Sequence, residues 1–337
     1  MKKVFAAPNG PSPLLHLNNV RTYFYTVEGT AKAVDDVSFT LNKSETVGLL
    51  GESGCGKSVT ALSIMRLVKD PPGKIVSGKI LFNGTDLLRV SSSRMKSLRG
   101  KRIAMIFQEP MTSLNPVYTI GDQISEMLVA HENMSKRESW ERAVDMIAKV
   151  QIPVPEKRAC EYPHQLSGGM RQRAMIAMAL ACKPEILIAD EPTTALDVTV
   201  QAQIIDLMLE LREEFGTAII LISHDLGVIA ETVERIVVMY AGKVVEEGST
   251  LNVFDAPKHP YTKGLFKSRP KIGERSRHGR RRLLEIQGAV PNLFELPGGC
   301  SFHPRCVEAI DACRETPPEL IPMGENRMVR CHLANTQ

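Results

Sequence analysis

Short apolar runs without alternation recur along the first three quarters of the chain. Runs of this length that are apolar on both faces are typical of strands in a parallel sheet with helices on each side. They are Thr46-Val47-Gly48-Leu49-Leu50, Ile103 to Phe107, Ile186 to Ala189, Ile219 to Ile222 and Ile236 to Met239. Two earlier segments, 15–20 and 33–41, alternate in part and predict short strands. The pattern therefore predicts an α/β fold.

Between residues 109 and 181 the apolar positions recur at helical spacing instead. Two sets of residues each share one helix face: Ile120, Ile124, Met127 and Leu128, and then Ala143, Met146, Ile147 and Val150. Apolar strands are predicted on both sides of this stretch. We therefore expect a helical subdomain, at about 109–181, inserted into the α/β core.

Beyond about residue 245 the apolar pattern weakens and prolines interrupt the chain repeatedly. We expect two domains, 1–245 and an irregular C-terminal domain, 246–337. The longest apolar runs, such as Ala218 to Ile222, are too short to cross a membrane. The amino terminus begins like a signal peptide, but Pro8 arrives before a sufficiently long apolar core, which favours a cytosolic protein.

Composition and charge narrow the class of protein only a little. Apolar residues make up 43% and charged residues 24% of the chain, which is ordinary for a soluble globular protein. The net charge of +4 is too small to indicate nucleic-acid binding. Lys267 to Arg282 holds eight Lys or Arg residues and one acid, Glu274. This stretch fits a solvated linker or, alternatively, a segment that faces an anionic membrane.

The run that ends at Leu50 leads directly into a glycine-rich loop, Gly51-Glu52-Ser53-Gly54-Cys55-Gly56-Lys57-Ser58, and a predicted helix, Ser58 to Leu67. A strand, loop and helix in this order form a phosphate-binding loop. The backbone of Gly51, Ser53, Gly54, Cys55 and Gly56 is expected to surround the phosphates of ATP. Lys57 should reach the β- and γ-phosphates, and the Ser58 hydroxyl should ligate Mg²⁺.

Two carboxylates, Asp190 and Glu191, follow the apolar run that begins at Ile186. We expect Asp190 to hold Mg²⁺, through water, and Glu191 to polarise the attacking water. Two acids after a strand also commonly cap a helix, and Pro192 fits that alternative. The phosphate-binding loop favours catalysis.

Further residues resemble, one by one, the motifs of the ABC-type ATPases. Leu166-Ser167-Gly168-Gly169-Met170 resembles the signature motif of that family, and Thr194-Ala195-Leu196-Asp197 resembles its D-loop. Gln108 matches the Q-loop glutamine, which senses Mg²⁺ and the γ-phosphate. His224 matches the switch histidine that contacts the γ-phosphate, although a lone histidine after a strand is usually structural.

The resemblance also implies how nucleotide is bound. In this family Ser167, Gly168 and Gly169 would close over the γ-phosphate held by a second subunit, with Asp197 at the dimer interface, so hydrolysis needs a dimer. Phe24 resembles the aromatic residue that stacks on adenine. Tyr23 or Tyr25 could replace it, and core packing is the alternative role.

Two segments resemble the ATPases of oligopeptide and dipeptide importers in particular. They are the ten residues from Phe107 to Pro116, and His259-Pro260-Tyr261 followed by a segment with four cysteines. The chain resembles the D-type subunit of the D/F pair. That family implies two permease membrane subunits, a second ABC ATPase of the F type and an extracytoplasmic peptide-binding protein. It also implies the cytoplasmic face of the membrane and no nucleic acid. Nickel, murein-peptide and glutathione importers share this ATPase type and remain alternatives.

Other functional classes explain the motifs less well. ABC proteins of DNA repair insert long coiled coils, and those of translation usually carry two cassettes. This chain has one cassette, with 57 residues between Gln108 and Leu166. A P-loop metabolite kinase would leave the signature motif and His224 unexplained.

Four cysteines, Cys300, Cys306, Cys313 and Cys331, lie within the last 38 residues of the chain. In a cytosolic protein such a group indicates metal binding more than disulfides. Their spacing leaves zinc, an iron–sulfur cluster and free thiols open, with His303 and His332 as competing ligands. Some relatives in the importer family hold a [4Fe–4S] cluster at the matching cysteines, so the resemblance implies such a cluster here. We expect its role to be structural, because nothing in ATP hydrolysis requires electron transfer.

Overall fold

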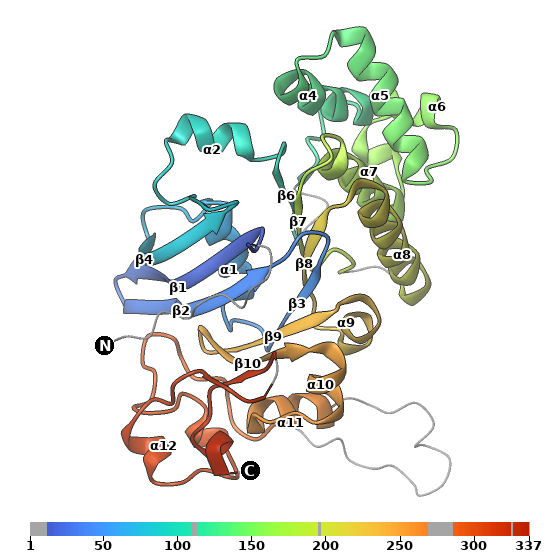
Figure 1. Cartoon of the computed structure of the whole chain (residues 1–337). Helices are drawn as coiled ribbons and strands as arrows, with labels where there is room; N and C mark the ends of the chain where they lie inside the picture. The colour runs from blue at the N-terminus through green and yellow to red at the C-terminus, as the bar shows by residue number, and fades with distance from the viewer. Residues whose placement is uncertain (1–11, 109–112, 195–196, 269–285, 325, 337) are drawn as a thin grey trace, which may run out of the picture.

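The computed structural model describes residues 12–108, 113–194, 197–268, 286–324 and 326–336. Across these residues the centre of the molecule is a sheet in the order β11-β12-β10-β9-β3-β8-β7-β6 (Figure 1). Its strands are β3 (Thr46–Leu50), β6 (Ile103–Ile106), β7 (Ile186–Asp190), β8 (Ala218–Ile222), β9 (Arg235–Tyr240), β10 (Lys243–Ser249), β11 (Ile321–Pro322) and β12 (Met328–Val329). From β9 to β6 neighbouring strands are parallel, as the apolar runs predicted.

A second, antiparallel sheet has the order β2-β1-β4-β5. Its strands are β1 (Leu15–Thr26), β2 (Gly29–Leu41), β4 (Gly73–Phe82) and β5 (Thr85–Asp86). Both β1 and β2 are longer than the short strands expected from the sequence. The register of β1 against β2 shifts between Leu17 and Val20, where two exposed asparagines intervene. The register shifts again between Val20 and Arg21 and between Thr22 and Phe24, so regular alternation stops just where the sequence pattern placed the end of the strand.

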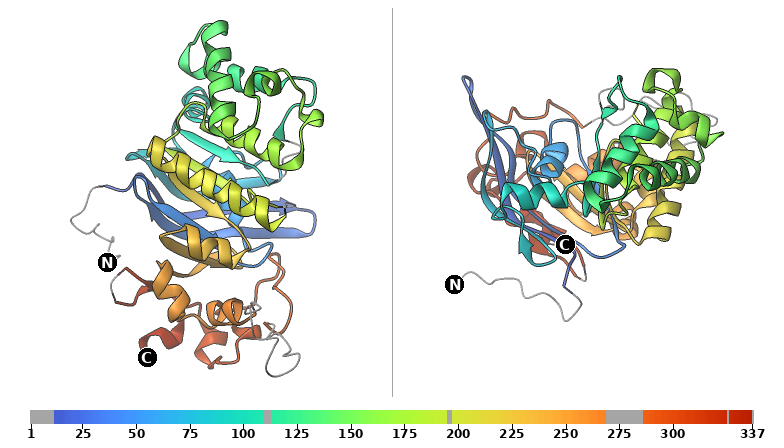
Figure 2. Two further views of the ribbon diagram at one scale, coloured as in Figure 1. Left: turned by 90° about the vertical axis from the view of Figure 1, so that its right-hand side faces the viewer. Right: turned by 90° about the horizontal axis from the view of Figure 1, so that it is seen from above.

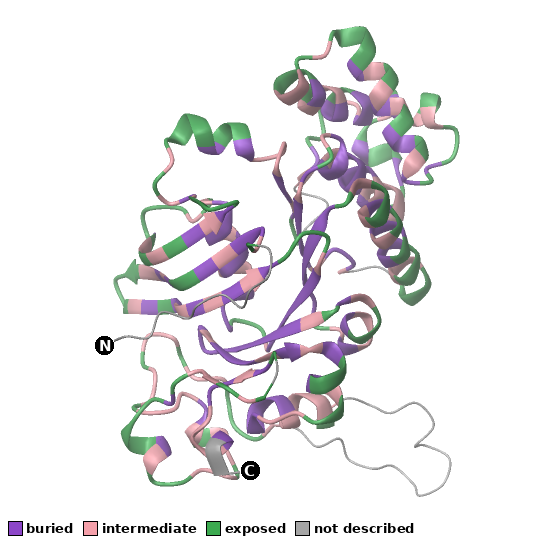
Figure 3. Cartoon of the chain, viewed as in Figure 1, coloured by how far each residue is buried: buried purple, intermediate pink, exposed green. Residues whose placement is uncertain are grey.

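Helices cover both faces of the central sheet. On one face α7 (Gly168–Leu180), α8 (Val198–Phe215) and α9 (Leu226–Thr232) pack against the strands in one apolar core. On the other face α1 (Lys57–Ile64) and α2 (Ser92–Leu98) share a core with the second sheet. Figure 2 shows α8 lying across the sheet, and Figure 3 shows the buried residues concentrated in the central strands.

The helical subdomain lies between β6 and β7, at the place the sequence predicted. Besides α7 it consists of α4 (Ile120–Glu132), α5 (Lys136–Lys149) and α6 (Pro155–Ala159). The predicted apolar faces of α4 and α5 are largely buried. The side chain of Ser135 accepts a hydrogen bond from the backbone of Glu138, whose own side chain returns the contact, and this capping box starts α5. The first expected residues of the subdomain, 109–112, lie outside the described residues.

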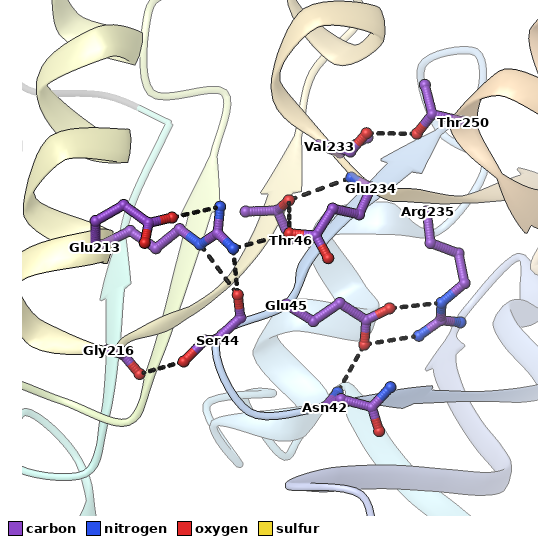
Figure 4. Close-up of polar contacts among 11 residues, drawn as sticks. Asn42, Ser44, Glu45, Thr46, Glu213, Gly216, Val233, Glu234, Arg235 and Thr250 are labelled. Carbon is purple, nitrogen blue, oxygen red and sulfur yellow. Dashed lines mark hydrogen bonds and ion pairs between the residues drawn. The ribbon is translucent and has the colours of Figure 1, made fainter.

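Ion pairs secure the amino end of β3, opposite the glycine-rich loop (Figure 4). The guanidinium of Arg235 on β9 donates to Glu45 at 2.8 Å and also pairs with Glu247 on β10. Burial raises the pKa of the Glu247 carboxyl, and the Arg235 charge opposes that rise. Arg212, near the end of α8, donates to Glu234 at 2.8 Å. These contacts fix the order of β10, β9 and β3 at the edge away from the loop.

The C-terminal region continues the central sheet. The predicted boundary between residues 245 and 246 falls within β10, and the division into two domains stays a prediction. In the described residues after β10, three short α-helices follow: α10 (Thr250–Asp255), α11 (Pro260–Lys267) and α12 (Ala312–Glu315). β12 pairs with β10 and with β11. Much of the remainder is irregular, and part of the basic stretch 267–282 lies outside the described residues.

A fully buried carboxylate, Glu246, organises the start of α11. It accepts hydrogen bonds from the backbone N–H groups of Lys258 and His259, both at 2.9 Å, and it pairs with Arg327. The Nδ1 of His259 then accepts from the N–H of Tyr261 at 3.0 Å and so caps the helix. The His-Pro-Tyr sequence is therefore a helix start fixed to a buried charge.

Replacement of His259 by Asn should make the protein less sensitive to acid. Burial lowers the pKa of His259 from 6.5 to about 3, so the fold holds the neutral ring while the unfolded chain takes up a proton. The contribution of neutral His259 to the free energy of unfolding is thus fully present above pH 6.5 and is lost as the pH falls toward 3. The linkage is worth about 2 kcal/mol between pH 7 and pH 5. Thermal unfolding at both pH values should show this loss in the parent and its absence in His259→Asn, whose amide can still cap. The exposed His164→Asn variant should behave like the parent, and an unchanged loss in His259→Asn would contradict the assignment.

Candidate active site

The glycine-rich loop joins β3 to α1 and is pressed against neighbouring backbone. A Cβ atom on Gly51 would lie 2.3 Å from the Met239 carbonyl oxygen, and one on Gly56 would lie 2.2 Å from the Ala33 carbonyl oxygen. Both glycines also have positive φ, at 149° and 104°. No other residue fits at these positions without displacing a strand. The strand, loop and helix that the phosphate-binding motif requires are thus confirmed.

Lys57 and Ser58 begin α1 and point back toward the loop and β7. The Lys57 ammonium is buried and donates to the carbonyl oxygens of Gly51 at 2.7 Å and Glu52 at 3.1 Å. The Ser58 hydroxyl donates to Asp190 Oδ1 at 3.2 Å. Ser58 on α1 and Asp190 on β7, the two residues expected to hold Mg²⁺, are therefore in direct contact.

Asp190 ends β7 as a buried carboxylate. Burial raises its pKa, with a smaller contribution in the same direction from the charge of Glu191, while the Ser58 hydrogen bond and Lys57 oppose the rise. A hydroxyl beside a desolvated carboxylate is an oxygen donor set suited to Mg²⁺, whose charge would stabilise the ionised acid. The residues present thus fit a magnesium ion bound with nucleotide phosphates.

Glu191 occupies a left-handed backbone conformation, with φ at 48°, and its N–H donates to the Ile222 carbonyl of β8. Its carboxylate Oε2 accepts from Gln108 Nε2 and from Thr194 Oγ1, both at 3.0 Å. The His224 Nδ1 lies 3.5 Å from the same oxygen. Gln108, Glu191 and His224, predicted separately, therefore meet at one point.

Thr194 is the member of this group that the sequence did not single out for chemistry. It lies three residues after Glu191, so one turn of backbone is enough to return its hydroxyl to the carboxylate. Ala195 and Leu196 of the same predicted D-loop lie outside the described residues. Asp197 caps α8 by accepting from the N–H of Val200 at 2.9 Å.

The signature motif lies at the start of α7. The Ser167 side chain caps the helix by accepting from the Met170 N–H at 3.3 Å, and a Cβ on Gly169 would lie 3.1 Å from Val200 on α8. Among the described residues, no hydrogen bond joins Ser167, Gly168 or Gly169 to the phosphate loop. Their backbone N–H groups and the helix dipole are available for an anion from elsewhere.

Phe24 is half-buried on β1, directly opposite Gly73 on β4. A Cβ on Gly73 would lie 2.8 Å from the Phe24 ring, so the ring covers that glycine. The Tyr23 hydroxyl donates to Asp35 at 2.8 Å, whereas Tyr25 is 51% exposed. Which of the three aromatic residues contacts adenine stays a prediction.

The four C-terminal cysteines come near one another. Burial raises the pKa of the Cys300 and Cys331 thiols and raises that of Cys306 to about 11, and neighbouring cysteines add to each rise. The backbone N–H of Cys300 donates to the carbonyl of Cys313 at 2.8 Å. Within the described part of the chain, no group of three or more His, Cys, Asp or Glu residues is placed to hold a metal ion. The expected metal centre is therefore not established.

An apolar groove of about 570 Å³ separates the α/β core from the helical subdomain. It is lined by Leu67 and Phe107 from the core side, Met127 of α4, and Met175 and Met178 of α7. Both Leu67 and Phe107 are partly exposed, at 37% and 41%.

No helix in the described residues is long and apolar enough to span a membrane.

Comparison with known proteins agrees with this geometry. A family model described as ABC transporter matches residues 34–194, and a second, described as Oligopeptide/dipeptide transporter, C-terminal region, matches residues 245–313. A solved ATP-binding cassette, described as a dimer in a post-hydrolysis state bound to ADP and Pi, superposes with a TM-score of 0.63. It is 29% identical and covers 70% of this chain and 98% of its own.

Relatives of known name match along almost the whole length. The oligopeptide transport ATP-binding protein AppD of Bacillus subtilis is 51% identical, over 96% of this chain and 97% of its own. The dipeptide transport ATP-binding protein DppD of Escherichia coli is 47% identical, over 95% and 96%. The chain therefore belongs to the ATP-binding subunits of the oligopeptide/dipeptide ABC transporter family.

Proposed function

We propose that this chain hydrolyses ATP to energise the import of peptides through a membrane ABC transporter. The observation that carries the proposal is the convergence of Gln108, Thr194 and His224 on the carboxylate of Glu191, next to the phosphate-binding loop. The AppD and DppD names support oligopeptides or dipeptides as the cargo. Nickel, murein-peptide and glutathione importers share the ATPase type and remain the alternatives.

The chain's own residues divide the hydrolytic work. Lys57 supplies positive charge to the β- and γ-phosphates, and Ser58 with Asp190 holds Mg²⁺. Glu191 polarises the attacking water, and Gln108 and His224 set the position of that carboxylate and sense the γ-phosphate. Ser53, Gly54, Cys55 and Gly56 direct backbone N–H groups at the phosphates, and Phe24 stacks on adenine. The Mg²⁺ neutralises charge on the phosphates when it is bound.

The catalytic unit is a pair of ATPase subunits. Within the part of the chain that the structure describes, the Ser167 turn makes no hydrogen bond to its own phosphate-binding loop. Its anion site therefore suits nucleotide on a second ABC ATPase, with Asp197 near the interface. The dimeric solved cassette supports this arrangement. The second subunit would be an F-type homologue, as in the D/F pair.

The groove lined by Leu67, Phe107 and the methionines is proposed to receive a cytoplasmic helix of a permease subunit. Its flexible methionine side chains can adapt to an apolar helix face. Phe107 lines the groove, and the next residue, Gln108, donates a hydrogen bond to Glu191. A movement of the docked permease helix that displaces Phe107 would therefore also displace the partner of the Glu191 carboxylate. The assembly would contain two permeases and an extracytoplasmic peptide-binding protein, with this chain on the cytoplasmic face of the membrane.

The cysteines Cys300, Cys306, Cys313 and Cys331 are proposed to bind one [4Fe–4S] cluster with a structural role. Their mutual proximity and the thiolate preference of iron–sulfur clusters support the proposal. Nothing in ATP hydrolysis requires electron transfer.

Glu191→Gln should abolish turnover and leave ATP binding intact, because the Mg²⁺ and phosphate ligands remain. A loss on the order of 10²–10⁴-fold in kcat is expected. Lys57→Ala should instead weaken ATP binding, because it removes a charge-assisted phosphate contact. Phosphate release and nucleotide binding, measured on both variants, separate the two roles. Parental hydrolysis by the Glu191 variant would contradict its catalytic assignment.

A photoreactive phenylalanine analogue in place of Phe107 should cross-link to a permease subunit in assembled transporter, because this side chain lines the proposed docking groove. The same analogue in place of Leu251, which is 74% exposed on α10, serves as the control and should not. Mass spectrometry identifies the partner. Cross-links from position 107 only to soluble proteins or nucleic acid would favour a different class of ABC protein.

Protein purified without oxygen should contain four iron and four sulfide per chain, as a [4Fe–4S] cluster does. Replacement of Cys306 by Ser should reduce both, because it removes one thiolate. Stoichiometric zinc without sulfide would reject the cluster but keep a metal-bound segment. The absence of every metal would reject both.

A further inference from the structure

Two side chains of the C-terminal region hydrogen-bond to the same residue of the phosphate-binding loop, Glu52. The Arg305 guanidinium donates to both carboxylate oxygens of Glu52, at 2.7 and 3.0 Å. The backbone N–H of Glu52 donates to the Tyr261 hydroxyl at 2.8 Å. Arg305 and Tyr261 thus hold the side chain and the backbone of the same loop residue, across more than 200 positions of sequence.

Arg305 is held rigidly for this contact. Its side chain is only 5% exposed, and its Nε donates to the Gln287 carbonyl at 3.1 Å. The guanidinium also donates to the Ile286 carbonyl at 3.3 Å and lies over the ring of Tyr240, 5.8 Å from the centroid. These contacts hold the Arg305 guanidinium in one orientation. Because its two hydrogen bonds to Glu52 are bidentate, they fix the orientation of the Glu52 carboxylate as well.

Tyr261 is equally constrained. Its side chain is fully buried and packs against Tyr240, with ring centroids 4.6 Å apart, and against Phe302 at 5.5 Å. The His259 cap on α11 fixes its backbone. The hydroxyl that receives the Glu52 N–H is thus supported by an aromatic cluster rather than by a mobile surface chain.

Glu52 in turn contacts the lysine of the loop. The Glu52 carbonyl oxygen accepts from the Lys57 ammonium at 3.1 Å, beside the 2.7 Å contact of the same ammonium with Gly51. The position of Glu52 therefore sets both the entry of the loop and the location of the positive charge that faces the phosphates.

We propose that Arg305 and Tyr261 are positioning residues for ATP: through Glu52 they hold the phosphate-binding loop and Lys57 in the nucleotide-binding geometry. The proposal rests on the ATP-hydrolysing function above. It gives the C-terminal region a role in nucleotide affinity, in addition to any role in holding metal or contacting partners. Since Arg305 directly precedes Cys306, changes among the cysteines reach the loop through this pair.

The test compares Arg305→Gln with Arg314→Gln in the full-length chain and in assembled transporter. Arg314 is an exposed arginine on α12 of the same region, next to Cys313. Arg305→Gln should raise the Kd and the KM for ATP about tenfold, as expected for loss of a charged hydrogen-bonded pair, with little change in kcat. Arg305→Lys should recover part of the affinity, because it keeps the charge and one contact. Arg314→Gln should match the parent.

A double-mutant cycle shows whether Arg305 acts through Glu52. Glu52→Gln should raise the Kd like Arg305→Gln, and the double variant should be no weaker than the worse single variant. Tyr261→Phe, which removes only the hydroxyl, should also raise the Kd. If Arg305→Gln does not fold, as judged by thermal unfolding, Glu52→Gln and Tyr261→Phe carry the same test.

Unchanged Kd and KM in Arg305→Gln, with faster proteolytic release of the C-terminal region, would mean that the pair only attaches that region, and would overturn the proposal. An equal effect of Arg314→Gln would overturn it as well. Nucleotide binding is measured separately from turnover. A parent that binds ATP without hydrolysing it would therefore count against the proposed function and not against the positioning role.

Discussion

The parallel pairing of β6, β7, β8, β3 and β9 is the constraint on which the site depends. In a parallel sheet all carboxyl ends meet at one edge, so the loops that follow neighbouring strands are brought together whatever their distance along the chain. The phosphate loop follows β3, Gln108 follows β6, Glu191 follows β7 and His224 follows β8. The ion pairs of Arg235 and Arg212 fix the opposite ends of these strands and so keep the loop edge in register.

Much of this arrangement could be predicted from the sequence, because local rules determine it. Apolar runs gave the parallel strands, helical spacing gave the inserted subdomain, and the glycines of the phosphate loop are required by close backbone contacts. The meeting of Gln108 and His224 at Glu191 follows from the order of the strands. The family resemblance named these residues, but the sequence pattern did not predict that order. No sequence pattern predicted that the Thr194 hydroxyl would donate a hydrogen bond to the Glu191 carboxylate.

The C-terminal region was predicted least well, because its structure depends on pairings between distant residues. The buried Glu246 gains its partners from Arg327 and from the turn before α11, and none of these is signalled by periodicity. The contact of Arg305 with Glu52 is of the same kind. The cysteines were visible in the sequence, yet their number and spacing did not indicate that Arg305, between Cys300 and Cys306, contacts Glu52 of the phosphate-binding loop.

The pairing of β12 with β10 has a consequence for how the cassette can be isolated. β10 is the last long strand on its side of the sheet, and among the described residues β12 pairs with its outer edge at Glu246 and Glu247, with β11 paired in turn to β12. Ending the chain after the cassette would leave a row of unpaired N–H and C=O groups, a template for strands of other chains. It would also remove Arg327, the ion-pair partner of the buried Glu246 carboxylate. We therefore expect an excised cassette to self-associate more readily than the whole chain.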